Sequence, residues 1–408
     1  MHTLAIIPAR GGSKGIPLKN LRRVAGRPLL AYAVLAARQS QRVDRVVVST
    51  DDARIAAVAR DHGAEVVLRS AELAGDEASS ESALLHAMGV LEEAGNAPPD
   101  ILVFLQCTAP QLRPEDIDGT VDLVATGDAD SAFAAVPFSH FLWRRGENGA
   151  AVAVNHDPGG RQRRQDRDGD YLEAGSVYAM RYAGFKQHRH RFFGRVALFP
   201  VDEERWVEVD EAPDLELADA LITHRDSRAA LEQLPRRPAA LVMDFDGVLT
   251  DDRVLVLEDG REGVVCHRGD GMGLELLRGL PVKVAVLSRE RNPVVAARCR
   301  KLEIEYRQGL LDKVTVLDAW LAENGVAATD TVFVGNDVND LGCMARVGCA
   351  VAVADARPEV LRAADLRLTR PGGHGAIREI TDLLRQRIGR GPAAEPAPPP
   401  ATPKETTP

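Results

Sequence analysis

The segment Leu4–Asn20, LAIIPARGGSKGIPLKN, decides how the first half of this chain folds. Its apolar start, Leu4–Pro8, is typical of a buried strand, and the glycines that follow predict a loop at the strand's carboxyl end. Glycines let backbone N–H groups approach an anion, and Arg10, Lys14 and Lys19 add positive charge. Such a loop suits a nucleoside triphosphate, although no GK[ST] opens a helix after it; the alternative is a basic loop without function.

Strand-like and helix-like segments alternate twice along the chain, which predicts an α/β protein with two Rossmann-like domains. We expect domains at residues 1–225 and 239–390, a linker at 226–238 and a disordered tail at 391–408, where seven of the 24 prolines lie. The expected strands cover residues 4–8, 45–49, 65–68, 101–105, 131–136, 240–246, 282–288, 331–337 and 349–355. The clearest helical patterns cover residues 29–39, 79–94, 293–302 and 312–323.

Composition excludes several classes of protein. The 408 residues carry 51 Lys+Arg and 60 Asp+Glu, a net charge of -9, which argues against a nucleic acid partner. No apolar run is long enough to cross a membrane, and no leader is expected before the first strand. The five cysteines include no CxxC pair, so we expect free thiols and a cytoplasmic protein.

A second strand-end motif begins the second domain. The buried run Leu241–Met243 leads into Asp244, Phe245 and Asp246. Two carboxylates at the end of a buried strand need a metal or a cation, because unpaired buried charges are costly. The pattern suits phosphoryl transfer, in which one carboxylate attacks phosphorus, another moves a proton and Mg²⁺ bridges them.

The first domain resembles the CMP-nonulosonate (sialic acid) synthetases, also called N-acylneuraminate cytidylyltransferases. The resemblance rests on IIPARGGSKGIPLKN, LQCTAPQLRPEDI and RRQDRDGDYLEAGSVYAM and covers Met1 to Leu221. It implies a GT-A-like mixed sheet and transfer of CMP from CTP to a nonulosonic acid. It also implies a cationic, catalytic Lys14 and a set of substrate-binding residues: Arg10, Gly11, Gly12, Ser13, Lys19 and Asn20 at the nucleotide with Gln106, and Arg164 and Gln165 at the sugar acid.

The same resemblance implies a magnesium site at Glu208 and Asp210. A strand over Trp206–Asp210 places both carboxylates on one face. Two departures from the family pattern stand out: Glu208 replaces an Asp, and Ala174 replaces an Asn of the sugar-binding strand. Without the resemblance, the two carboxylates fit a solvated strand face better than a metal site.

The second domain resembles the haloacid-dehalogenase phosphatases, and within them the cap-less parallel-sheet enzymes acting on 3-deoxy-octulosonate 8-phosphate. DFDGVLT, RGDGMGLELLRGL and RPGGHGAIREITDLL carry this resemblance from Ala239 to Arg387. It implies a sugar-acid phosphate substrate. Asp244 is then the nucleophile, Asp246 the general acid and base, Ser288 the phosphoryl-binding hydroxyl and Lys313 a catalytic cation. The implied Mg²⁺ ligands are Asp244, Asp246 (through its carbonyl) and a residue of the fourth motif, GNDVND from Gly335. There Asn336 replaces the Asp of many active relatives, and Asp337 or Asp340 is the alternative ligand.

A hairpin is expected over Arg253–Cys266, with Asp259-Gly260 as its turn. Its apolar strands are poorly stable alone, so we expect packing against another subunit and a homotetramer formed through the second domain.

Three alternatives remain open on the sequence alone. The second domain is a non-catalytic oligomerisation module, the sugar is 3-deoxy-octulosonate, or the chain is a nucleotide-binding protein without catalysis.

Overall fold

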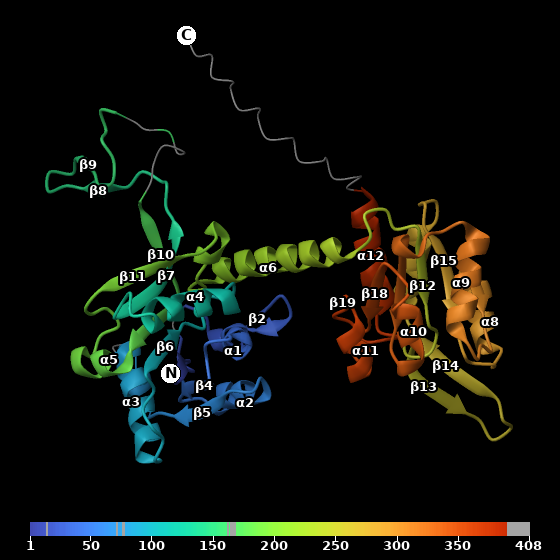
Figure 1. Cartoon of the computed structure of the whole chain (residues 1–408), viewed down its shortest axis with the longest axis horizontal. Helices are drawn as coiled ribbons and strands as arrows, with labels where there is room; N and C mark the ends of the chain where they lie inside the picture. The colour runs from blue at the N-terminus through green and yellow to red at the C-terminus, as the bar shows by residue number, and fades with distance from the viewer. Residues whose placement is uncertain (14, 71, 76–77, 161–162, 164–168, 390–408) are drawn as a thin grey trace, which may run out of the picture. The chain divides into compact units, whose positions relative to one another are not determined.

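The structure, a computed structural model, describes residues 1–13, 15–70, 72–75, 78–160, 163 and 169–389. Lys14, Arg164, Gln165 and the expected tail over residues 391–408 therefore lie outside the described residues. The chain divides into two compact units, Met1–His224 and Arg225–Pro408 (Figure 1). The stretch expected as a linker is helical as far as Gln233, because α6 (Ala212–Gln233) continues through it and buries Leu231 in the second unit's core.

A seven-stranded mixed sheet forms the centre of the first unit, in the order β11-β7-β10-β6-β1-β4-β5. β10 runs antiparallel to β6 and β7, whereas the remaining neighbours are parallel, so the expected mixed α/β sheet is confirmed. The strands are β1 (Thr3–Pro8), β4 (Arg45–Thr50), β5 (Glu65–Leu68), β6 (Ile101–Leu105), β7 (Ser131–Pro137), β10 (Tyr171–Arg181) and β11 (Val196–Pro200). Two short pairs stand apart from it: β2 (Arg23–Val24) with β3 (Arg27–Pro28), and β8 (Trp143–Arg145) with β9 (Ala151–Ala153).

Helices cover both faces of this sheet (Figure 1). Alternate side chains of β1 point to opposite faces: Ala5 and Ile7 join the core with α1, α2 and α4, whereas Leu4 and Ile6 join the core with α3 and α5. The strand is buried on both sides, which explains its continuous apolar sequence. The helices are α1 (Leu29–Gln39), α2 (Ala53–Asp61), α3 (Ser80–Glu93), α4 (Pro114–Ala125) and α5 (Tyr182–His188).

The second unit contains a parallel six-stranded sheet in the order β16-β15-β12-β17-β18-β19, as expected for its class. Its strands are β12 (Ala240–Met243), β15 (Lys283–Leu287), β16 (Glu305–Arg307), β17 (Thr331–Gly335), β18 (Cys349–Ala352) and β19 (Leu366–Arg367). Its helices are α7 (Arg268–Leu277), α8 (Val294–Leu302), α9 (Lys313–Asn324), α10 (Leu341–Met344), α11 (Pro358–Ala363) and α12 (Ala376–Gly389).

The expected hairpin is present as β13 (Thr250–Val256) and β14 (Glu262–Cys266), an antiparallel pair outside the main sheet. Gly260 adopts φ +80, which suits the turn between the strands.

The expected strand over Trp206–Asp210 is wrong. A 3₁₀ turn covers Glu203–Trp206, and the residues after it are extended but join no sheet. The alternating pattern has another cause: Val207 and Val209 are buried in a small core with residues of α1 and α6.

All five cysteines are free thiols. Among the described helices, none is both long and apolar enough to cross a membrane.

Candidate active sites

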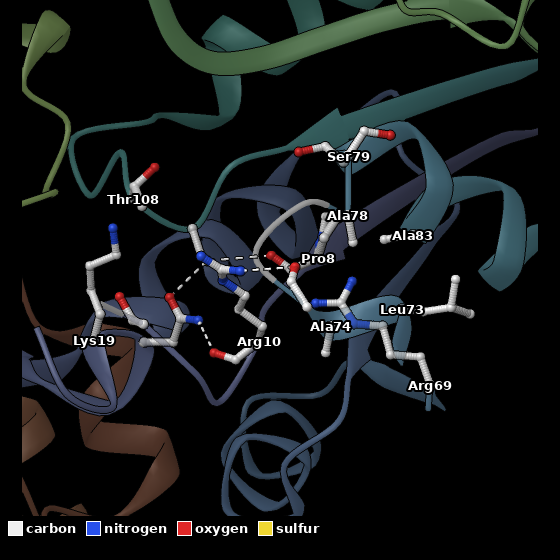
Figure 2. Close-up of a pocket in the computed structure, with 15 residues that line it drawn as sticks. Pro8, Arg10, Lys19, Arg69, Leu73, Ala74, Ala78, Ser79, Ala83 and Thr108 are labelled. Carbon is white, nitrogen blue, oxygen red and sulfur yellow. Dashed lines mark hydrogen bonds between the residues drawn. The ribbon is translucent and has the colours of Figure 1, made fainter. Parts of the chain in front are cut away.

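A cavity of about 270 Å³ lies beside the carboxyl end of β1 (Figure 2). Four residues that the sequence assigned to the nucleotide line it: Arg10, Ser13, Lys19 and Asn20. The side chains come from the loop after β1, because that strand ends at Pro8 and the chain then turns along the edge of the sheet. The geometry therefore brings two of the predicted cations to one cavity.

Asn20 fixes the shape of this loop. Its buried amide donates to the Arg10 carbonyl (3.0 Å) and accepts from the Cys107 Sγ (3.0 Å). Burial raises the pKa of Cys107 to about 11, so its thiol keeps the proton that this hydrogen bond needs. Cys107 is thus a buried hydrogen-bond donor in the cavity lining.

Gly11, Gly12 and Gln106 lie near the cavity without lining it. The Gly11 N–H donates to Asp51 Oδ1 (2.9 Å), and the Gln106 N–H donates to the Ser176 carbonyl (3.0 Å). These backbone donors are already used, whereas the open space around Gly12 leaves room for a ligand. The role of the three residues at the nucleotide stays a prediction.

Arg69 is a cavity residue that the sequence analysis missed. It follows β5, is only 9% exposed, and borders the cavity with Arg10 and Lys19 (Figure 2). Its Nε has no hydrogen-bond partner, so the buried guanidinium retains a donor for a ligand. The available signal was a charged residue placed directly after the strand Glu65–Leu68, at the same sheet edge as Arg10.

The acidic pair Glu208 and Asp210 lies next to the same loop. Lys19 Nζ donates to Asp210 Oδ1 (2.9 Å), and the Val209 N–H donates to the carbonyl of Thr108, a cavity residue (2.8 Å). Burial, with the neighbouring carboxylates of Asp210 and Glu173, raises the pKa of Glu208 to about 7. A group of carboxylates thus lies beside a cavity that is lined by positively charged side chains.

Gly175 of β10 accommodates Glu208. It adopts φ +60, and a Cβ at this position would lie 1.4 Å from Glu208 Oε1. We expect Gly175→Ala to strain the backbone, displace Glu208 and lower the free energy of unfolding by about 1–3 kcal/mol. Calorimetric unfolding measures this effect, with Gly12→Ala as a control that meets nothing within 4 Å. Equal stability of Gly175→Ala and wild type would contradict the tight fit.

The first site suits magnesium by the chemistry of its donors. Among the residues the structure describes, no three His, Cys, Asp or Glu side chains form a metal-binding group. Magnesium, however, is commonly held by one or two carboxylates and substrate phosphates, and Glu208 and Asp210 are oxygen donors beside the cavity. Burial is the main cause of the raised pKa of Glu208, and the charges of Asp210 and Glu173 add to it; a cation beside these carboxylates would offset the contribution of the charges.

A second cavity, of about 410 Å³, lies at the carboxyl end of β12. The predicted residues Asp244, Asp246, Ser288, Asn336 and Asp337 all line it. They follow β12, β15 and β17, which are neighbours in the parallel sheet, so their carboxyl ends meet at one edge. The Ser288 Oγ accepts from the Glu290 N–H (3.0 Å), which leaves its own proton for a ligand.

Lys313 reaches this site from the first turn of α9. Its Nζ lies 2.7 Å from Asp244 Oδ2 and 2.8 Å from Asp340 Oδ1, and all three side chains are buried. Burial and then the Asp340 charge raise the pKa of Asp244 to about 7, which Lys313 counteracts. Burial lowers the pKa of Lys313, but the two carboxylates outweigh this and leave it raised.

Asp246 has the properties of a proton donor. Burial, and then the charges of Glu290 and Asp252, raise the pKa of Asp246 to about 6. A carboxyl with such a pKa exchanges its proton near neutral pH, which suits the predicted general acid and base.

An unpartnered oxygen in the second cavity fits a magnesium ligand. The buried Asn336 Oδ1 accepts no hydrogen bond, although its residue lies beside Asp244 in the cavity lining. The other fourth-motif carboxylates are engaged: Asp337 accepts from the Val338 N–H (2.6 Å), and Asp340 binds Lys313 and the Asn336 N–H (3.0 Å). Asn336, with the Asp244 carboxylate and the Asp246 carbonyl, gives an oxygen-only donor set for Mg²⁺.

These two sites define a class of protein: an α/β enzyme that joins a nucleotidyltransferase domain to a haloacid-dehalogenase-type phosphatase domain. Comparison with protein families agrees, since a cytidylyltransferase family matches residues 4–180 and a haloacid dehalogenase-like hydrolase family matches residues 303–377.

Known proteins resemble both parts of the chain. An N-acylneuraminate cytidylyltransferase of Oncorhynchus mykiss is 31% identical over 94% of this chain and 88% of its own length. The chain therefore belongs to the N-acylneuraminate cytidylyltransferase family. A 3-deoxy-D-manno-octulosonate 8-phosphate phosphatase of Haemophilus influenzae is 36% identical over 37% of this chain and 84% of its own. A solved structure of a putative HAD family hydrolase from Streptomyces avermitilis is 50% identical over 37% of this chain and 87% of its own, with a TM-score of 0.36.

Proposed function

We propose that the first domain transfers CMP from CTP to the anomeric hydroxyl of a sialic-acid-type nonulosonate and releases pyrophosphate. The observation that carries this proposal is the cavity in which Arg10, Lys19 and Arg69 gather beside Glu208 and Asp210. Three cations suit a triphosphate, and the family relatives support CTP as its source. The free thiols agree with action in the cytoplasm.

The reaction is an attack of the sugar hydroxyl oxygen on the α-phosphorus of CTP. The oxygen–phosphorus bond forms, the bond to pyrophosphate breaks, and the hydroxyl proton leaves to solvent. Negative charge spreads over the phosphoryl oxygens, and the Arg10, Lys19 and Arg69 side chains are placed to stabilise it. A magnesium ion held by Glu208 and Asp210 supplies further charge neutralisation when bound.

A panel of sugar acids tests the substrate. Pyrophosphate release with CTP should be fast with nonulosonates and at background with 3-deoxy-octulosonate. The opposite ranking would favour the alternative sugar, and no release with any sugar acid would leave a nucleotide-binding protein without this activity.

We propose further that the second domain removes phosphate from the nonulosonate 9-phosphate. Asp244 attacks phosphorus, the bond between phosphorus and the sugar oxygen breaks, and Asp246 gives its proton to that oxygen. Asp246 then takes a proton from the water that attacks the aspartyl-phosphate, which releases inorganic phosphate and restores the Asp244 carboxylate. Ser288 and Lys313 hold the phosphoryl oxygens, and Mg²⁺ at Asp244, Asp246 and Asn336 supplies charge neutralisation when bound. The product is the sugar acid that the first domain consumes, which makes the fusion chemically coherent.

We also propose that the second domain assembles a homotetramer through its hairpin. Val254, Leu255, Val256 and Val265 are 56–68% exposed, so apolar side chains lie open to solvent along β13 and β14. We expect wild type to be tetrameric by light scattering, and Leu255→Lys/Val265→Lys to be smaller. A monomeric wild type would contradict the proposal, whereas Arg228→Ala, an exposed position on α6, should leave the mass unchanged.

A further inference from the structure

A buried ion pair lies just before the acidic segment of the first site. Arg205, 8% exposed, pairs with Asp116, 2% exposed, and its NH2 also lies 2.9 Å from Asp202 Oδ2. Asp116 belongs to the first turn of α4, where its other oxygen accepts from the Arg113 N–H (3.0 Å). The carboxylate is therefore fixed by the helix, and it fixes the guanidinium in turn.

Arg205 belongs to the 3₁₀ turn that leads directly into Glu208 and Asp210. A second contact anchors the same turn to the stretch before α4, since the Gln111 amide donates to the Glu204 carbonyl (2.5 Å). Beyond the turn, the chain is held by the Val209 N–H bonded to the Thr108 carbonyl (2.8 Å). The acidic segment joins no sheet, so these contacts and the burial of Val207 and Val209 set its position in place of a strand ladder.

Burying the Arg205–Asp116 ion pair carries a large desolvation penalty. A buried ion pair is often matched in stability by apolar residues of similar size, because desolvation offsets its attraction. Burial raises the pKa of Asp116 to about 6, and Arg205 counteracts this; because that pKa is still below 7, the Asp116 carboxyl is mostly ionised at neutral pH. Unlike an apolar contact, an ion pair with hydrogen bonds fixes the orientation of the two side chains and so the position of the turn that carries Arg205.

We propose that Arg205 and Asp116 are positioning residues that hold Glu208 and Asp210 where they meet the metal-bound triphosphate. The proposal rests on the proposed function of the first site. Arg205 and Asp116 are not among the described residues that line the nucleotide cavity. Both would therefore act indirectly, by holding the segment 207–210 that follows Arg205.

The test measures how much Mg²⁺ tightens CTP binding in the full chain, by calorimetric titration with and without the ion. CTP reports on the first site alone, whatever metal the second domain takes. The variant is Asp116→Asn/Arg205→Met, which removes both charges so that neither is left buried and unpaired. We expect its unfolding temperature to stay near that of wild type and the tightening by Mg²⁺ to fall about 10-fold.

Two reference variants interpret the result. Arg42→Met/Asp122→Asn removes an exposed ion pair between α4 and the loop after α1, and it should keep the full effect of Mg²⁺. Glu208→Gln should lose it. If Glu208→Gln keeps the effect, the proposed function of the acidic pair is wrong. If Glu208→Gln loses it but Asp116→Asn/Arg205→Met does not, the positioning role is wrong.

Discussion

Asp244→Asn should lower phosphate release from a nonulosonate 9-phosphate by at least about 10³-fold. The amide cannot attack phosphorus, and an aspartyl-phosphate can no longer form. The fold should survive, because Lys313 keeps its contact with Asp340 at 2.8 Å and the site retains one buried carboxylate for one buried ammonium. Phosphate release at saturating Mg²⁺ measures the loss, and pyrophosphate release from CTP by the same variant should match wild type.

Asp318→Asn is the matched control, since that carboxylate lies on α9 in a half-exposed pair with Arg346. It should release phosphate as fast as wild type. Background release from wild type and Asp244→Asn alike would contradict the proposed phosphatase activity and favour the alternative that the second domain is an oligomerisation module. Loss of pyrophosphate release in Asp244→Asn would indicate instead that the variant is misfolded or that the two activities are linked.

Site residues that lie in one continuous segment could be predicted from the sequence. Arg10, Lys19 and Asn20 lie within a single loop, so the loop's place after a buried strand already brings them together. Asp244 and Asp246 are predictable for the same reason, because both follow β12 directly. In both units the strand ends meet at one sheet edge, which is a property of parallel neighbours.

The features that could not be predicted from the sequence depend on packing between segments that are far apart in the chain. The alternation of Val207 to Asp210 resembles a strand, but the buried valines pack against helices, and within the described residues this segment joins no sheet. Arg69 reaches the cavity from a separate strand, and Asp116 pairs with Arg205 across 89 positions of the chain. Such pairings depend on which segments fold together: Asp116 lies in the motif LQCTAPQLRPEDI, but the motif does not indicate its partner.

The metal ligand of the second site could be predicted only in part from the sequence, as Asn336 shows. Its replacement of an acidic residue is visible in the fourth motif, yet the sequence left Asn336 and Asp337 as equal candidates for the metal. We propose Asn336 as the ligand, because its Oδ1 is buried without a partner whereas Asp337 accepts a backbone N–H. An amide adds no charge, so the site is less negative than its acidic counterpart and is expected to hold Mg²⁺ more weakly.

Lys19→Met should lower kcat/KM for CMP transfer by about 10²–10³-fold. The Lys19 ammonium borders the cavity and binds Asp210 at 2.9 Å, so the variant removes a fixed positive charge from the triphosphate and leaves the Asp210 carboxylate without that partner. Both changes weaken the stabilisation of the negative charge that develops in the transition state as pyrophosphate leaves. Pyrophosphate release with CTP and a nonulosonate measures the effect, and phosphate release by the second domain should be unchanged.

Lys186→Met separates this effect from the general loss of a lysine. Lys186 lies on α5 and binds Glu92 at 2.9 Å on the exposed side of the same domain, so its removal takes away one positive charge and one ion pair without touching the cavity. It should transfer CMP within about twofold of wild type, because exposed ion pairs contribute little to stability. Equal rates for Lys19→Met and Lys186→Met would show that the triphosphate binds elsewhere. A large loss in Lys19→Met alone, with partial recovery in Lys19→Arg, is the pattern expected of a cation that contacts phosphate oxygens.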